Sequence, residues 1–169
     1  MTKIFLIGLP GSGKTTLGKA LAINLQLSFE DLDVAIERSE GSTVSHIFDA
    51  KKEDYFRRVE SKSLMDFCQS QKNFVMAVGG GAPCFYDNMQ RMNDAGTTIF
   101  LDVPVAEVVS RLMKTNLADR PLLAGLSRDQ LTNKLTTLRT QRLEFYNRAK
   151  FVLSGAELSA GGLQLLLTK

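Results

Sequence analysis

A chain of 169 residues has the length of one domain, about 100–200 residues, and can bury a sizeable core. With 44% hydrophobic and 23% charged residues it is globular in composition, which excludes a disordered chain. No apolar run approaches the roughly 18 residues that span a membrane, and the first residues lack a signal-peptide layout. A net charge of +3 is too small to indicate a nucleic-acid partner. We therefore expect one cytoplasmic domain, residues 1–169, with Cys68 and Cys84 as free thiols.

Short apolar runs alternate with helical periodicities along the chain. Strands are predicted at residues 3–8, 28–30, 74–78, 97–101 and 151–153. Helices are predicted at 14–25, from 42 or 43 to about 70 with a bend, and at 86–95, 105–113, 128–149 and 158–167. This alternation predicts an α/β protein, a three-layer α/β/α fold around a mostly parallel, five-stranded sheet. Ligands of such sheets bind at the carboxyl ends of the strands.

Residues 114–127 lack periodicity and contain polar and turn-forming residues, among them Lys114, Asp119, Arg120, Pro121 and Gly125. Loops of this length inside a compact domain are usually functional. We expect this segment to be a mobile lid.

The strongest motif is GLPGSGKT at residues 8–15, which matches G-x-x-x-x-G-K-[ST] between a predicted strand and a predicted helix. Its glycines let successive backbone N–H groups point at phosphate oxygens. Lys14 brings a charge to the β- and γ-phosphates, and the Thr15 hydroxyl suits Mg²⁺. The motif predicts binding of a nucleoside triphosphate. A GTPase switch is disfavoured because the nearest string to Asn-Lys-x-Asp, NKLT at 133–136, lacks the aspartate.

Three weaker features suggest a second substrate. Asp31 and Asp33 are predicted to point to one face of an extended segment, where one carboxylate can serve the metal and the other a reacting hydroxyl. Arg57 and Arg58 point about 100° apart on a helix, so at most one faces a given site. The glycine triplet 79–81 permits close approach of a ligand to the backbone. Taken singly, the first two features are explained better by solvated acids at a strand end and by a solvated helix face.

Together these residues resemble shikimate kinase from about residue 3 to residue 149. The resemblance is carried, in order, by GLPGSGKTT, FEDLD at 29–33, Phe56-Arg57 with Glu60, the glycine triplet, and RPLL at 120–123. Many families share a P-loop, whereas the combination is far more specific. The resemblance implies an ATP-dependent kinase that phosphorylates the 3-hydroxyl of shikimate, in the biosynthesis of aromatic amino acids through chorismate. Its co-substrate is ATP and its cofactor is Mg²⁺.

The resemblance also implies the roles of individual residues. The catalytic residues are Lys14, Asp33 and Arg120. The ATP-binding residues are Gly11, Ser12, Gly13, Lys14, Thr15, Thr16 and Arg120. The shikimate-binding residues are Asp33, Gly79, Gly80, Gly81, Arg142 and, rather than Arg58, Arg57. The metal-site residues are Thr15 and, through water, Asp31. The expected partners are ATP and shikimate alone, with no nucleic acid and no membrane, and the expected state is a monomer.

Two other hypotheses stay open at this point. One is another small-molecule kinase of the same fold, since gluconate also combines a carboxylate with hydroxyls and nucleotide kinases share the P-loop. The other is a non-catalytic ATP-binding module. The residues that contact adenine are not identified, because Lys114 does not align securely and residues 154–157 lack the arginine or proline often found in the family.

Overall fold

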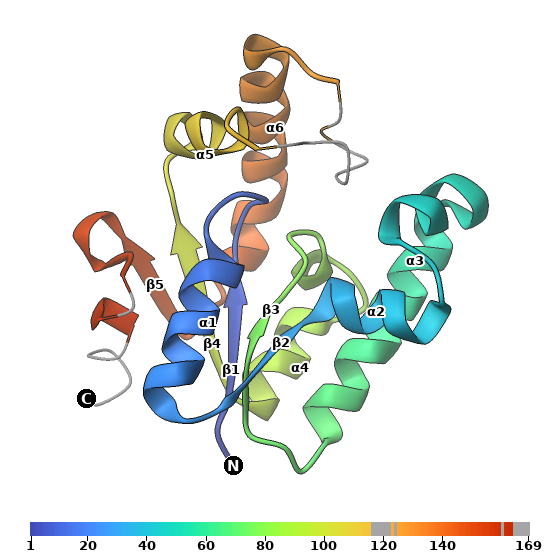
Figure 1. Ribbon diagram of the computed structural model, residues 1–169, viewed down its shortest axis with the longest axis vertical. Coiled ribbons are helices and arrows are strands. Elements are labelled where there is room, and N and C mark those ends of the chain that lie inside the picture. Colours follow the sequence, from blue (N-terminus) through green and yellow to red (C-terminus); the bar gives the residue numbers. More distant parts are fainter. Residues whose placement is uncertain (116–122, 124, 160, 164–169) are drawn as a thin grey trace.

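The structure is a computed structural model that describes residues 1–115, 123, 125–159 and 161–163. In this part of the chain five strands form one sheet in the order β2-β3-β1-β4-β5 (Figure 1). All neighbouring strands are parallel, as predicted. The strands are β1 (Lys3–Ile7), β2 (Ser28–Asp31), β3 (Phe74–Ala77), β4 (Thr97–Asp102) and β5 (Phe151–Ser154).

Helices connect the strands and cover both faces of the sheet. The α-helices are α1 (Lys14–Leu25), α2 (Leu32–Glu40), α3 (Val44–Gln69), α4 (Asn88–Ala95), α5 (Val105–Leu112) and α6 (Arg128–Tyr146). The short 3-10 helices are η1 (Ala82–Cys84) and η2 (Gly155–Glu157). All of the α-helices except α2 correspond to predicted helices.

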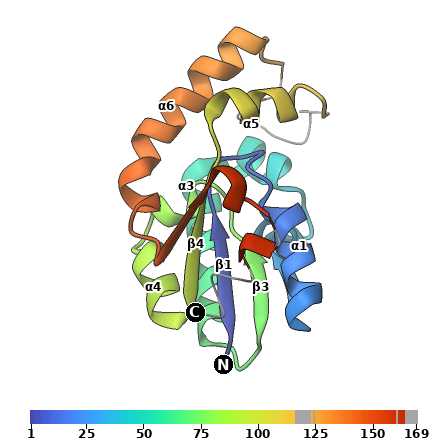
Figure 2. The same cartoon turned by 90° about the vertical axis from the view of Figure 1, so that its left-hand side faces the viewer.

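The sheet separates two hydrophobic layers because side chains alternate along each strand. In β1, Ile4 and Leu6 belong to one layer, and Phe5 and Ile7 belong to the other. All four side chains are at most 1% exposed. Helix α1 packs on the first layer, whereas α3 and α4 pack on the second (Figure 2). The predicted three-layer α/β/α fold is therefore confirmed.

Helix α2 corrects the prediction that Asp31 and Asp33 lie in an extended segment. The helix begins at Leu32, and Asp31 is its N-cap, whose carboxylate accepts a hydrogen bond of 3.1 Å from the backbone N–H of Asp33. An acceptor at the N-cap and an acid in the first turn both stabilise a helix start. Leu32 is fully buried in the core. The Asp-x-Asp spacing is thus a helix-start signal.

Helix α3 contains the predicted bend, at Lys52. This residue has φ 70° and ψ 168°, which is not helical. Glycine adopts such a conformation readily, whereas a residue with a side chain incurs a cost of about 1–3 kcal/mol. The bend lies directly before Glu53, whose carboxylate accepts hydrogen bonds from Arg57. The strained residue therefore directly precedes the part of α3 that carries Glu53 and Arg57.

The loops with chemical motifs all begin at the same edge of the sheet. Leu6 in β1 pairs with both Ala77 in β3 and Ile99 in β4, and Asp31 in β2 pairs with Ala77. The carboxyl ends of β1, β2 and β3 are therefore within one residue of each other, and β4 continues past them to Asp102. Helix α5 and the first part of α6 project beyond this edge (Figure 1).

Three smaller predictions concern the C-terminus, the thiols and membrane segments. Of the predicted helix 158–167, residues 161–163 are helical, while 160 and 164–169 lie outside the described residues. Cys68 and Cys84 are free, as predicted. In the part of the chain described, the structure contains no helix that is long and apolar enough to cross a membrane.

Candidate active site

Nearly all the residues singled out in the sequence line one open pocket of about 860 Å³ at the carboxyl edge of the sheet. These lining residues are Gly11, Gly13, Lys14, Thr15, Thr16, Asp31, Asp33, Arg57, Gly79, Gly80, Gly81 and Arg142. Ser12 is buried within its loop and contributes no lining surface. Arg120 lies outside the described residues, as does most of the predicted lid. Leu123, the described residue three positions later, is buried and lines the pocket.

The P-loop, residues 8–15, turns from β1 into α1. Gly13 is the N-cap of α1 with φ 94°, a left-handed conformation that glycine adopts without strain. The Lys14 Nζ donates hydrogen bonds to the carbonyl oxygens of Gly8, at 3.0 Å, and Leu9, at 2.9 Å. The ammonium group therefore lies across the loop beside the helix N-terminus, where its charge and the helix dipole both favour an anion.

Thr15 and Asp31 place two oxygen ligands side by side. The Thr15 hydroxyl donates a hydrogen bond of 3.2 Å to the Asp31 carboxylate. Mg²⁺ prefers oxygen ligands and commonly keeps water and substrate phosphates as ligands, so one or two protein groups suffice. Among the described residues, no group of three or more His, Cys, Asp or Glu side chains could hold a metal. The pair fits a metal that binds together with a nucleotide.

Two carboxyl groups flank the first glycine of the triplet. A Cβ atom added to Gly79 would lie 2.9 Å from Glu60 Oε1 and 3.2 Å from Asp33 Oδ1. Glu60 is buried, whereas Asp33 is partly buried at the start of α2. Burial and then the negative charge of Asp31 raise the pKa of Asp33, and the charge of Lys14 partly offsets them. The Asp33 carboxylate is consequently a stronger base than an exposed aspartate.

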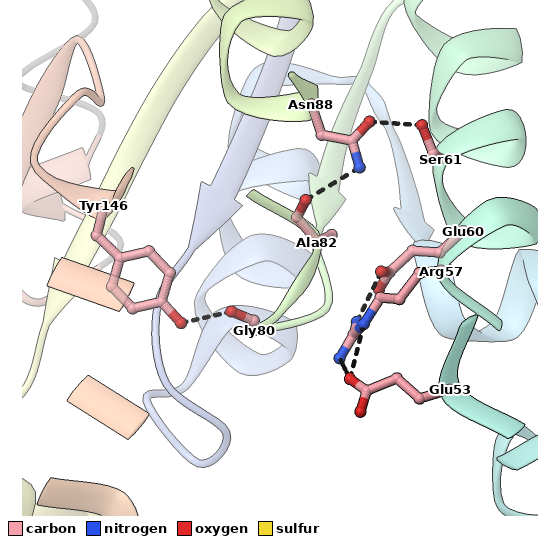
Figure 3. A network of polar contacts seen from close by, with 8 residues as sticks. All are labelled: Glu53, Arg57, Glu60, Ser61, Gly80, Ala82, Asn88 and Tyr146. Atoms are coloured by element: carbon pink, nitrogen blue, oxygen red, sulfur yellow. Dashed lines mark hydrogen bonds and ion pairs between the residues drawn. The ribbon is translucent and has the colours of Figure 1, made fainter. Parts of the chain in front are cut away.

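Arg57 lies at the centre of an ion-pair network on α3 (Figure 3). Its Nη1 donates to Glu60 Oε2 at 2.7 Å, and its Nε and Nη2 both donate to Glu53 Oε1, at 3.1 and 3.0 Å. The residue is 4% exposed and lines the pocket. Arg58, by contrast, is exposed and does not line the pocket. The helix therefore directs Arg57, and not Arg58, into the site.

The glycine loop is held from the opposite side by α6. The Tyr146 hydroxyl donates to the Gly80 carbonyl oxygen at 2.6 Å (Figure 3). One turn earlier on the helix, Arg142 is buried, and a Cβ atom at Gly80 would lie 3.0 Å from its Nη1. Arg142 and Arg57 therefore approach the glycine loop from two different helices.

Two charged residues that line the pocket, Arg111 and Glu60, have no role in the sequence-based assignment, although Glu60 is part of the resemblance. Arg111 in α5 lines the pocket, and its Nη1 donates to the Ser12 carbonyl oxygen at 3.3 Å. Nothing local signals this contact, because the two residues are 99 positions apart. Glu60, by contrast, lies three residues after Arg57, a spacing at which opposite charges meet on a helix. That spacing could have identified it.

Glu60 makes the stability of the protein dependent on pH. Burial raises the pKa of Glu60 from 4.5 to about 7, although the charge of Arg57 opposes the shift. A carboxyl with a higher pKa in the folded state binds its proton more tightly there. Its contribution to the free energy of unfolding is therefore complete below pH 4.5 and is lost as the pH rises through about 7.

We expect the free energy of unfolding to decrease between about pH 5 and 8, and to decrease less in Glu60→Gln, which cannot titrate. Urea unfolding of both proteins across this range measures the difference. Loss of the charge also changes the Arg57 ion pair, but that effect does not titrate with Glu60. Identical pH dependence in the two proteins would contradict the assignment.

The phosphate-binding loop, an aspartate with a raised pKa and two buried arginines share one pocket. This arrangement defines the class of protein: a P-loop kinase that acts on a small molecule. The comparisons with known proteins narrow the class. The sequence model described as shikimate kinase matches residues 10–161. The chain belongs to the shikimate kinase family, whose members are ATP-dependent phosphotransferases, as the sequence predicts.

Individual relatives agree with this assignment over nearly the whole chain. A shikimate kinase of Phocaeicola vulgatus is 44% identical over 158 residues, which cover 94% of this chain and 89% of that protein. The crystal structure of shikimate kinase from Bacteroides thetaiotaomicron has a TM-score of 0.91 at 39% identity and covers 99% of both chains. The structure of shikimate kinase from Acinetobacter baumannii in complex with shikimate has a TM-score of 0.88 at 32% identity, covering 99% of this chain and 94% of that one.

Proposed function

We propose that this protein transfers the γ-phosphoryl group of ATP to the 3-hydroxyl of shikimate, in the biosynthesis of aromatic amino acids through chorismate. The observation that carries the proposal is that Lys14, Asp33, Arg57 and Arg142 line a single pocket. Lys14 suits a phosphate, Asp33 suits a hydroxyl, and the two arginines suit a carboxylate. Shikimate is a small ring with one carboxylate and three hydroxyls, so it matches Asp33 and the two arginines. The relative whose structure is a complex with shikimate supports the same assignment.

At the nucleotide end, we assign Gly11, Ser12, Gly13 and Thr16 to phosphate binding through the P-loop and the first turn of α1. Lys14 stabilises the charge that develops on the transferred group. Thr15 and Asp31 would hold Mg²⁺, the latter through water, and the ion would supply positive charge that offsets the charge of the phosphates.

At the shikimate end, Arg57 and Arg142 bind the carboxylate with charge-assisted hydrogen bonds, and the backbone of Gly79, Gly80 and Gly81 lines the ring. The 3-hydroxyl oxygen forms a bond to the γ-phosphorus while the bond from that phosphorus to the bridging oxygen of ADP breaks. Asp33 orients the hydroxyl and accepts its proton, for which its raised pKa suits it.

We also propose that residues 114–127 close over the bound substrates as a lid and that Arg120 binds the phosphates. Arg120 lies outside the described residues, so the support for its role is the RPLL resemblance. The burial of Leu123 in the pocket wall supports it, since that residue returns the segment to the site. Closure would exclude water, which competes with shikimate for the phosphoryl group.

A coupled assay of ADP release tests the function, with shikimate, gluconate and AMP offered separately in the presence of ATP and Mg²⁺. We expect turnover with shikimate well above the rate without acceptor, and none above it with gluconate or AMP. Preference for gluconate or AMP would assign a different kinase of this fold. No turnover with any of the three would favour a non-catalytic ATP-binding module. The single domain, the monomeric state, the cytoplasmic location and the absence of nucleic-acid and membrane partners stay predictions.

A further inference from the structure

Phe85 is a large apolar side chain that does not belong to either hydrophobic layer. It directly follows η1 and is 37% exposed. Its ring lies over the guanidinium group of Arg57, with the Cζ atom 4.6 Å from the ring centroid. The rings of Phe56 and Phe48 are farther from the same atom, at 5.3 and 5.9 Å. Of these three rings, that of Phe85 lies nearest to the cation.

The guanidinium group of Arg57 has neighbours both at its edges and against its flat surface. Glu53 and Glu60 bind its N–H groups, which fixes its direction within the plane. A Cβ atom at Gly81 would lie 2.5 to 2.7 Å from Nη2, Cζ and Nη1, three nearly equal distances. The backbone of Gly81 thus faces the flat surface of the guanidinium group. The Phe85 ring and Gly81 therefore both lie close against the guanidinium group.

The loop that carries Phe85 is itself held in place. Asn88 Nδ2 donates to the Ala82 carbonyl oxygen at 3.0 Å, and the Ser61 hydroxyl donates to Asn88 Oδ1 at 2.8 Å (Figure 3). All of these groups are buried. Ser61 follows Glu60 directly on α3, so the helix of Arg57 and the loop of Phe85 are tied together. The ring is therefore held at a defined place over the cation.

The two residues after Phe85 store backbone strain. Tyr86 has φ 49° and Asp87 has φ 57°, a left-handed conformation that residues with side chains seldom adopt, still less in succession. Such strain persists where the surrounding structure enforces it, and it gathers at functional sites. Here the strained pair turns the chain from Phe85 into α4.

We infer that Phe85 is a positioning residue for Arg57: its ring holds the guanidinium plane in the orientation that binds the substrate carboxylate and shields that ion pair from water. The inference rests on the proposed function. A cation over an aromatic face is stabilised by the ring quadrupole, more strongly when water is excluded. Arg binds a carboxylate in a planar geometry, so the orientation of the plane determines how well the two groups meet.

Steady-state kinetics of Phe85→Ala, Phe85→Leu and Phe85→Tyr test the inference. We expect the first two to raise the KM for shikimate about five- to tenfold, on the scale of one cation–π contact, with kcat and the KM for ATP nearly unchanged. Phe85→Tyr keeps the aromatic face, so its KM for shikimate is expected to stay close to that of the unmodified protein. Tyr86→Ala is the matched control, because this exposed neighbour has no described contact with Arg57. A thermal unfolding curve confirms that each variant is folded.

A double-mutant cycle separates positioning from a general loss of structure. In the Arg57→Ala background, Phe85→Ala is expected to add no further increase in KM, because the cation that it positions is absent. An equal further increase would show that Phe85 acts independently, and an unchanged KM in both Phe85→Ala and Phe85→Leu would overturn the inference. Failure of the unmodified protein to phosphorylate shikimate would overturn the proposed function and this inference with it.

Discussion

Replacement of Lys14 by methionine is expected to lower kcat by about 100-fold or more while the protein stays folded, on the scale of losing one group that stabilises the transition state. Methionine keeps much of the length of the side chain but removes its charge. Phosphoryl transfer involves little covalent chemistry by the protein, so catalysis depends on positioning and on stabilisation of charge. The Lys14 ammonium group already lies across the P-loop, hydrogen-bonded to the carbonyl oxygens of Gly8 and Leu9.

The measurement is a single assay of ADP release at saturating ATP and shikimate, with urea unfolding to confirm the fold. Lys19→Met is the matched control, since this exposed residue of the same helix does not line the pocket. It removes the same charge from α1 outside the site. A near-normal kcat in Lys14→Met, or an equal loss in Lys19→Met, would contradict the role of Lys14.

The parts of this fold and site that could be predicted from the sequence are those set by local spacing. The P-loop is one contiguous motif between a strand and a helix, and each buried strand is a short apolar run. Asp31 and Asp33 reach the same pocket as predicted, but for a different reason. The chain there is a helix start and not an extended strand, because a backbone N–H two residues on binds the first carboxylate.

Contacts between distant segments could not be predicted in the same way. Arg111 reaches the P-loop from α5 only because the sheet places the ends of β1 and β4 side by side. In the sequence, Phe85 is an ordinary apolar residue. Its contact with Arg57 arises only because the fold brings α3 and the glycine loop together. The choice between Arg57 and Arg58 came from the family resemblance, since two adjacent arginines differ in direction but not in local pattern.

Arg57→Ala is expected to raise the KM for shikimate about 10- to 150-fold, which corresponds to the loss of a charged hydrogen bond of about 1.5–3 kcal/mol. The KM for ATP is expected to change little, because the hydrogen-bond partners of Arg57, Glu53 and Glu60, lie on α3 and not in the P-loop. Arg58→Ala is the matched control: it removes the same side chain one position on, from an exposed site, and is expected to leave both KM values unchanged.

Loss of Arg57 also leaves the buried Glu60 without its ion-pair partner, which is destabilising in itself. Arg57→Lys therefore accompanies the alanine variant: it keeps a positive charge beside Glu60 but loses the planar fork that binds two oxygens at once. We expect this variant to fold, to bind ATP normally and still to show a raised KM for shikimate. Because Arg57 and Arg58 point about 100° apart, equal effects at the two positions, or a larger one at Arg58, would mean that α3 presents a different face to the substrate.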